Sequence, residues 1–211
     1  MKPNEIEQES FRIIESEAGD HGFPPDQWVI VRRMIHATAD FDYLSSVRFH
    51  PDAIASGINA IKSGCKIIAD IQMVRTGINK KLLNPFGCEV HCFINDPETV
   101  SMAERNQRTR SESAVELAAD MMKGGIYVIG NAPTALLRLL DLVEEDKARP
   151  ALIIGFPVGF VNAAESKERL LNSKCPYITN CGRKGGSSTA VSAVNALAHL
   201  AGVLEGSGLD S

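Results

Sequence analysis

Apolar positions along the chain predict a sheet of five short strands separated by helices. The strand-like runs cover residues 66–70, 89–94, 126–129, 151–154 and 177–179, and helix-like periodicity fills the segments between them. Alternating strands and helices favour a mainly parallel sheet with helices on both faces. We therefore expect a three-layer, doubly wound α/β fold in which ligands bind outside the carboxyl ends of the strands.

The chain before the first predicted strand carries further elements. Residues 4–18 predict a helix, residues 41–49 a short extended piece, and residues 52–61 another helix that opens at an aspartate. A length of 211 residues supplies one sizeable core. We expect a single domain over residues 1–204 and a flexible tail in the Gly/Ser-rich residues 205–211.

The stretch from residue 24 to residue 40 predicts an amphipathic helix. Trp28, Val31 and Ile35 recur at i, i+3 and i+7, so this stripe should face the core. The two prolines that lead the stretch suit a first helical turn, where a missing N–H is tolerated.

Two arginines share this helix with a histidine. Arg32 and Arg33 precede His36 by four and three residues, so either guanidinium can lie on the same face as the imidazole. Because a nearby cation disfavours imidazolium, we expect His36 to be neutral near pH 7 and to gain a proton when an anionic ligand cancels the arginine charge. A solvated helix face with one satisfied histidine is the alternative.

Three loops that follow predicted strands have unusual compositions. They cover residues 130–134, 155–162 and 180–189, and all three are expected at the ligand-binding edge of the sheet. The last loop opens the C-terminal helix, so its N–H groups and cations form a candidate anion site. Its spacing is not that of a nucleotide-binding loop, and a glycine turn with a solvated basic pair is the alternative. The candidate residues are Arg183, Lys184, Gly185, Gly186 and Ser187.

Capping residues predict two helix starts. Ser111 is a candidate N-cap that would leave Arg110 just outside its helix, where a surface arginine is the commoner case. Asn131 is a candidate cap for the helix that Pro133 opens.

Composition narrows the classes of partner. The net charge is -4 and no long basic run occurs, which argues against nucleic acid or an anionic membrane surface as the main partner. The first residues are polar and no apolar run approaches the length of a membrane span, so we expect a cytoplasmic protein with a small-molecule ligand.

The cysteines predict reduced thiols and no protein-held metal. They number five, at positions 65, 88, 92, 175 and 181, and form no CxxC pair. Cys88, His91 and Cys92 lie close in sequence, but on a strand the two thiols would point to one side and the imidazole to the other.

Several motifs, taken in order, resemble the precorrin-8 methylmutases of cobalamin biosynthesis. The likeness extends from about Ser10 to the C-terminal helix. It implies a flavodoxin-like sheet, a homodimer with the tetrapyrrole near the subunit interface, and migration of a methyl group from C-11 to C-12 of the macrocycle without an external cofactor. The motifs are Arg33-Met-Ile-His36, residues 39–43, 76–80, 130–136, 157–161 and 163–167, and Gly182-Arg-Lys-Gly-Gly-Ser187.

The resemblance also implies roles for individual residues. His36 matches the catalytic histidine, Ser10 and Arg33 match substrate-contacting positions, and Arg110 matches an arginine that points to the substrate. A histidine can polarise a conjugated ring by protonating or hydrogen-bonding a ring nitrogen and then recovering the proton. Arginines and the loop at residues 182–189 suit the substrate's carboxylates.

Alternatives remain for the substrate and for the class of function. Residues 39–43, 77–81 and 182–186 look more like the branch that handles the cobalt complex, with cobalt carried inside the substrate; the metal-free macrocycle is the alternative. A non-catalytic tetrapyrrole carrier would need the arginines but not His36. A phosphate-ester enzyme ranks last, because Asp70 is an isolated carboxylate at a strand end.

Overall fold

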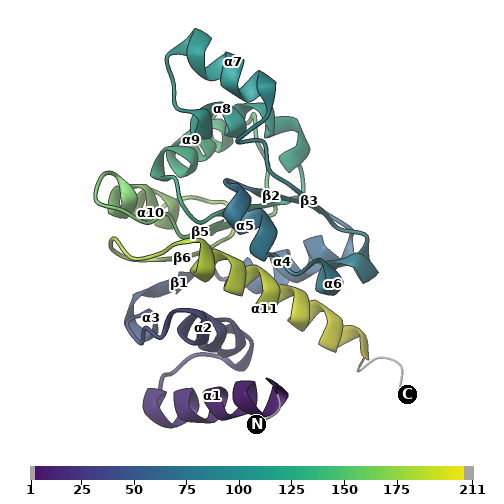
Figure 1. Ribbon diagram of the computed structural model, residues 1–211, viewed down its shortest axis with the longest axis vertical. Coiled ribbons are helices and arrows are strands. Elements are labelled where there is room, and N and C mark those ends of the chain that lie inside the picture. The colour runs from purple at the N-terminus through teal and green to yellow at the C-terminus, as the bar shows by residue number, and fades with distance from the viewer. Residues whose placement is uncertain (1–2, 207–211) are drawn as a thin grey trace.

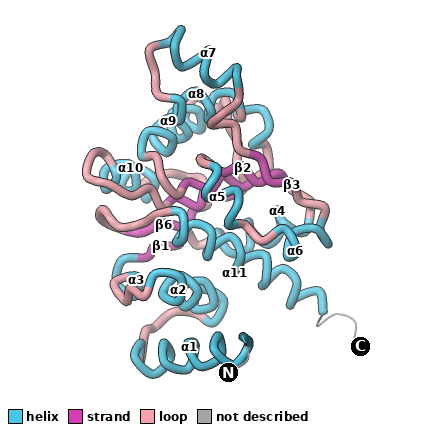
Figure 2. Tube along the Cα trace, viewed as in Figure 1, coloured by secondary structure: helices cyan, strands magenta, loops and turns pink. Residues whose placement is uncertain are grey.

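The computed structural model describes residues 3–206 of the chain. Within them, six strands lie in the order β1-β6-β5-β4-β2-β3, and β2 to β6 are parallel. This mainly parallel sheet, flanked by helices, confirms the predicted α/β class (Figure 1 and Figure 2). The strands are β1 (Val47–Phe49), β2 (Lys66–Ala69), β3 (Glu89–His91), β4 (Ile126–Ile129), β5 (Leu152–Gly155) and β6 (Tyr177–Asn180).

The sheet has one strand more than the five predicted. The segment expected as one extended piece divides into a short helix and β1. β1 runs antiparallel to β6, with Val47 opposite Asn180. A strand of three residues offers too few positions for an alternating pattern, so its place depends on the partner strand rather than on its own sequence.

Helices cover both faces of the sheet because its strands alternate their buried side chains. Ile126 and Val128 of β4 pack in one core cluster with the helices of the α2, α4 and α11 side, whereas Tyr127 and Ile129 pack with those of the α8, α9 and α10 side. The helices of the described part are α1 (Pro3–Ala18), α2 (Pro25–Thr38), α3 (Tyr43–Ser46), α4 (Ala53–Lys62), α5 (Gln72–Gly77), α6 (Lys80–Leu83), α7 (Pro97–Asn106), α8 (Arg110–Leu117), α9 (Pro133–Glu144), α10 (Ala163–Leu171) and α11 (Ser187–Gly206), with 3-10 turns at Asn84–Phe86 and Ala119–Met122.

α2 lies between α11 and α1. It packs on α11, and α1 forms a further layer at the end of the molecule (Figure 1). The stripe of Trp28, Val31 and Ile35 is buried as predicted, with Val31 fully inaccessible. α1 therefore covers part of α2, and His36 in the last turn of α2 stays exposed.

The C-terminal helix extends beyond the predicted domain end. Residues 205 and 206 of the expected tail are the last residues of α11, and residues 207–211 lie outside the described part of the chain. Among residues 3–206, no helix is long and apolar enough to cross a bilayer.

Candidate functional site

His36 lies exposed in the last turn of α2. The helix ends at Ala39, which adopts a left-handed conformation with φ 52° and donates its N–H to the carbonyl of Ile35. The helix end thus places the imidazole on the surface, between α1 and α11. The rings of His36 and Phe11 lie 5.2 Å apart, so α1 supplies an aromatic wall on one side of the imidazole.

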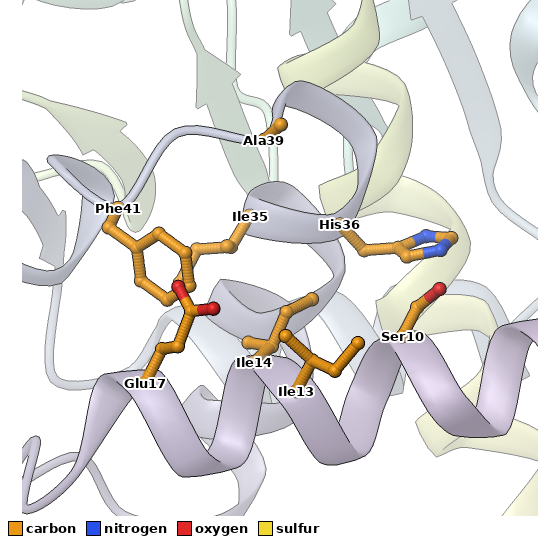
Figure 3. A pocket seen from close by; sticks show the side chains of 8 residues that line it. All are labelled: Ser10, Ile13, Ile14, Glu17, Ile35, His36, Ala39 and Phe41. Atoms are coloured by element: carbon orange, nitrogen blue, oxygen red, sulfur yellow. The ribbon is translucent and has the colours of Figure 1, made fainter.

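His36 lines two hollows, one on each side. The first, which we call the α1-side hollow, has a volume of about 270 Å3, and Figure 3 shows Ser10 and His36 coming together there from α1 and α2. The second, the α11-side hollow, has a volume of about 340 Å3 and contains Arg33 and His36. The remaining lining residues are Ile13, Ile14, Glu17, Ile35, Ala39 and Phe41 in the first hollow, and Ala37, Ser188, Val191, Ser192 and Asn195 in the second.

Both arginines beside His36 have carboxylate partners on α1. Arg32 pairs with Glu15 at 2.7 Å, and Arg33 pairs with Glu7 at 3.3 Å. Both guanidiniums also lie against the Phe11 ring, at 4.4 and 5.4 Å from its centre. His36 therefore does not face the uncompensated cation expected from the sequence, because the register of α1 brings in two glutamates.

Glu15 is the more firmly held of these two carboxylates. Desolvation acts to raise its pKa, but hydrogen bonds from Trp28 Nε1 and Arg32 outweigh that effect and lower the pKa below the ordinary value. Glu7 makes the longer contact with Arg33, so Arg33 is the arginine that an incoming anion can engage more readily.

The predicted basic pair follows β6 in residues 181–186, which we call the basic loop. Lys184 Nζ contacts Asp40 at 2.7 Å and Asp42 at 2.6 Å, and these hydrogen bonds raise the pKa of Lys184 far above its usual value. Its charge is thus balanced within the chain. Arg183 is exposed and lies 5.6 Å from the centre of the Phe160 ring, which is itself 84% exposed.

The glycines of the basic loop allow close packing. Gly185 has φ 156°, and a Cβ at this position would collide with the carbonyl oxygen of Phe156. Gly186 donates its N–H to the same carbonyl at 2.8 Å. Ser187 begins α11, and the next residue, Ser188, lines the α11-side hollow. The loop therefore leads directly to the surroundings of His36.

A carboxylate accepts hydrogen bonds from the backbone N–H groups at the start of the loop at residues 130–134. Asp70, at the end of β2, accepts hydrogen bonds from the N–H groups of Gly130, Asn131 and Ala132 at 3.1, 2.9 and 3.1 Å. Burial raises the pKa of Asp70, and the three N–H bonds act in the opposite direction. The prediction that Asn131 caps this helix is wrong, because the N-cap is Ala132 and the oxygen comes from another strand.

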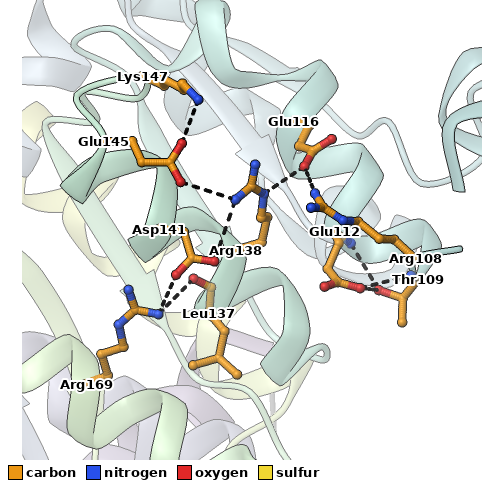
Figure 4. Close-up of polar contacts among 10 residues, drawn as sticks. All are labelled: Arg108, Thr109, Glu112, Glu116, Leu137, Arg138, Asp141, Glu145, Lys147 and Arg169. Atoms are coloured by element: carbon orange, nitrogen blue, oxygen red, sulfur yellow. Dashed lines mark hydrogen bonds and ion pairs between the residues drawn. The ribbon is translucent and has the colours of Figure 1, made fainter. Parts of the chain in front are cut away.

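Arg110 lies far from His36 in this chain. It is the first residue of α8, which lies near one end of the molecule, whereas α1 and α2 lie at the other (Figure 1). The prediction of Ser111 as N-cap is wrong, because Thr109 forms a capping box with Glu112 and places Arg110 inside the helix. Neighbouring ion pairs join Arg108 to α8, α8 to α9, and α9 to α10 at this end of the molecule (Figure 4).

The five cysteines are all free thiols. Among residues 3–206, no three His, Cys, Asp or Glu side chains are grouped so that they could hold a metal ion. Cys88 donates its thiol to the carbonyl of Ile61 rather than turning toward His91, whose imidazole contacts Glu89 at 3.0 Å.

The fold is a mainly parallel α/β sheet with helices on both faces, and its candidate site centres on an exposed histidine between two hollows that Ser10 and Arg33 line. Residues 5–200 match the family described as precorrin-8X methylmutase. The chain belongs to this family of isomerases, which shift a methyl group during corrin biosynthesis.

Curated relatives and a solved structure agree with this family. A cobalt-precorrin-8 methylmutase of Priestia megaterium is 48% identical over 201 residues, which cover 95% of this chain and 89% of the relative. A precorrin-8X methylmutase of Pseudomonas aeruginosa is 42% identical over 195 residues, covering 92% and 93%. The precorrin-8x methyl mutase structure of Thermus thermophilus has a TM-score of 0.89 at 45% identity and covers 99% of both chains.

Proposed function

We propose that this protein converts cobalt-precorrin-8 into cobyrinate by moving a methyl group from C-11 to C-12. The observation that carries the proposal is the exposed imidazole of His36 between two hollows, with Ser10 in one and Arg33 in the other. Relatives at 48% and 47% identity are named cobalt-precorrin-8 methylmutase, which supports the cobalt complex as the substrate. Metal-free precorrin-8X, giving hydrogenobyrinate, is the alternative.

His36 acts as both acid and base in the proposed mechanism. The imidazolium protonates or hydrogen-bonds a ring nitrogen, which polarises the conjugated system. The bond from the methyl group to C-11 breaks as the bond to C-12 forms, and the proton returns to His36. The step is an isomerisation without net change in electrons, so it needs no resident cofactor, and any cobalt belongs to the substrate.

The substrate's carboxylates require cationic partners near His36. Arg33 is the nearest candidate, since its side chain lines the α11-side hollow and its pair with Glu7 is exposed enough to exchange partners. Arg183 of the basic loop adds a cation next to the exposed ring of Phe160. Lys184 and the backbone of Gly185, Gly186 and Ser187 contribute mainly by shaping this loop, because the Lys184 charge is already balanced by two aspartates.

The proposed active form is a homodimer with a shared cleft. Each hollow beside His36 is near or below the lower end of the range of about 300–1,000 Å3 that is usual for ligand pockets, and a corrin precursor is large. α8, which begins with Arg110, lies at the end of the molecule opposite α2 (Figure 1). Contact of Arg110 and His36 with one macrocycle therefore requires two copies, most simply related by a twofold axis.

A cytoplasmic setting is part of the proposal. All five cysteines are unpaired, as is usual for proteins of reducing compartments.

Visible spectroscopy tests the proposal directly. The protein is incubated separately with cobalt-precorrin-8 and with metal-free precorrin-8X, and the spectrum of the macrocycle is followed over time. We expect conversion of the cobalt complex to cobyrinate. Conversion of the metal-free compound alone would reverse the choice of substrate, binding without conversion would indicate a carrier, and neither binding nor conversion would overturn the proposal.

A further inference from the structure

Lys167 is a fully buried lysine on α10 beneath the basic loop. Its side chain is 0% exposed. It shares one face of α10 with three other buried residues at the helical spacing i, i+3, i+4 and i+7, a stripe that would ordinarily be apolar. The other members are Ala163, Ser166 and Leu170.

The Lys167 ammonium fixes the backbone of the basic loop. Its Nζ donates to the carbonyl of Lys184 at 2.6 Å and to Asn180 Oδ1 at 3.2 Å. The Asn180 amide donates to the same carbonyl at 2.9 Å and to the carbonyl of Cys181 at 3.1 Å. The Lys184 carbonyl is therefore held by two donors, and the next residue, Gly185, is packed against the carbonyl of Phe156.

This arrangement connects α10 with the helix that carries His36. With its backbone held by Lys167, Lys184 extends its own ammonium to Asp40 and Asp42, just beyond the end of α2. The same loop then opens α11, whose Ser188 lines the hollow beside His36. A substitution at Lys167 should therefore alter the position of the basic loop at the substrate-binding surface, although Lys167 lies beneath that surface.

The charge on Lys167 has no carboxylate partner among residues 3–206. Asp141 and Glu144 of the neighbouring α9 pair with Arg169, and the aspartates at the basic loop pair with Lys184. Cys181 is the titratable group that influences it from the loop. Burial lowers the pKa of Lys167 to about 8, with Cys181 acting in the opposite direction, so the ammonium is retained near pH 7 and lost in mildly alkaline solution.

We propose that Lys167 is a positioning residue for substrate binding: its buried, uncompensated ammonium holds the basic loop in place and makes the surface above it favourable for a substrate carboxylate. This inference rests on the proposed function, because it assumes a polycarboxylate ligand beside His36. It assigns no proton transfer to Lys167. An ammonium buried without a carboxylate is unfavourable for folding, so its contribution should appear in binding rather than in stability.

The first test compares Lys167→Met with Lys174→Met, which removes an exposed lysine just beyond the same helix. The ligand is cobyrinate, titrated by its visible absorbance at pH 7. We expect Lys167→Met to raise the Kd about tenfold and the KM similarly, because a hydrogen-bonded charge is lost, with kcat little changed. Lys174→Met should bind like wild type.

Urea denaturation distinguishes a positioning role of Lys167 from a purely structural role. Met fills a similar volume without a charge to desolvate, so Lys167→Met should resist urea at least as well as wild type. Reduced stability together with unchanged cobyrinate affinity would show that Lys167 serves only the fold, and would overturn the inference.

A pH series supplies a second test, which begins with the wild-type protein. Between pH 7 and pH 9 the substrate carboxylates stay ionised while Lys167 loses its proton, so the wild-type Kd for cobyrinate should rise about tenfold. Cys181→Ser and His36→Ala should each keep most of this rise, which excludes the thiol and the imidazole as its main source, and Lys167→Met should abolish most of it. A flat wild-type series, or the same rise in Lys167→Met, overturns the inference. Failure of wild type to bind cobyrinate at any pH instead overturns the proposed function and this inference with it.

Discussion

The imidazole of His36 is exposed, so its removal should affect chemistry far more than folding. We expect His36→Ala to lower kcat by about 10²–10⁴, the usual contribution of a positioned acid–base group. Its Kd for cobyrinate should stay within about tenfold of wild type, or 1.4 kcal/mol, because the group acts mainly in the transition state. Stopped-flow spectra and equilibrium titration measure the two quantities. Turnover at the wild-type rate would remove His36 from the mechanism.

Arg33→Ala should affect substrate binding more than turnover, the opposite of His36→Ala. Arg33→Ala is expected to weaken cobyrinate binding by about 1.5–3 kcal/mol, since a charged hydrogen-bond partner is lost. Its exposed pair with Glu7 contributes only about 0–1 kcal/mol to folding, so the urea midpoint should barely move. Arg12→Ala is a matched control, because Arg12 pairs with Glu9 on the exposed face of α1. Equal affinities in both variants would exclude Arg33 as a substrate ligand.

At the scale of elements, α9 depends on a carboxylate from β2. Asp70→Ala would leave the N–H groups of Gly130, Asn131 and Ala132 without an acceptor, at about 1–3 kcal/mol for each fully buried group. Gly130 and Ala132 are buried whereas Asn131 is exposed, so we expect a total loss of about 2–6 kcal/mol in the free energy of unfolding, measured by urea denaturation. Asp52→Ala is the control, since Asp52 precedes α4 without forming a capping bond. A loss below about 1 kcal/mol would mean that water replaces the carboxylate.

The sequence predicts those elements whose pattern is local. The runs at β2 to β6 and the stripe of Trp28, Val31 and Ile35 depend on alternation or helical spacing within one segment, and both are confirmed. β1 is too short for such a pattern. The cap of α9 could not be foreseen either, because its oxygen belongs to Asp70, some 60 residues earlier in the chain.

In the candidate site too, the sequence predicts some residues and misses others. Ser10, Arg33 and His36 were predicted and line adjoining hollows. The partners that define their surroundings were missed, because Glu7, Glu15 and Phe11 reach α2 only once α1 has docked at a particular angle. The sequence does indicate Lys167, because this lysine shares a helical stripe with Ala163, Ser166 and Leu170, which are small or apolar. Charge normally indicates exposure, and that expectation hides a buried lysine.

At the scale of the whole molecule, the separation of Arg110 from His36 makes a prediction about assembly. In one chain, α8 and α2 lie toward opposite ends, so a macrocycle that contacts both residues would lie between two copies (Figure 1). Sedimentation at micromolar concentration should therefore show a dimer. A fully active monomer would contradict the shared cleft.

Mixed dimers test whether the two residues of one site come from different chains. His36→Ala and Arg110→Ala should each be inactive or nearly so as homodimers. When the two variants are co-expressed, a heterodimer with shared clefts has one site that lacks both residues and one that has both intact. Random pairing makes half of the dimers mixed, with one of their two sites restored, so activity should recover to about a quarter of wild type. If His36 and Arg110 of the same chain formed each site, every site in the mixture would lack one of them, and no activity would return.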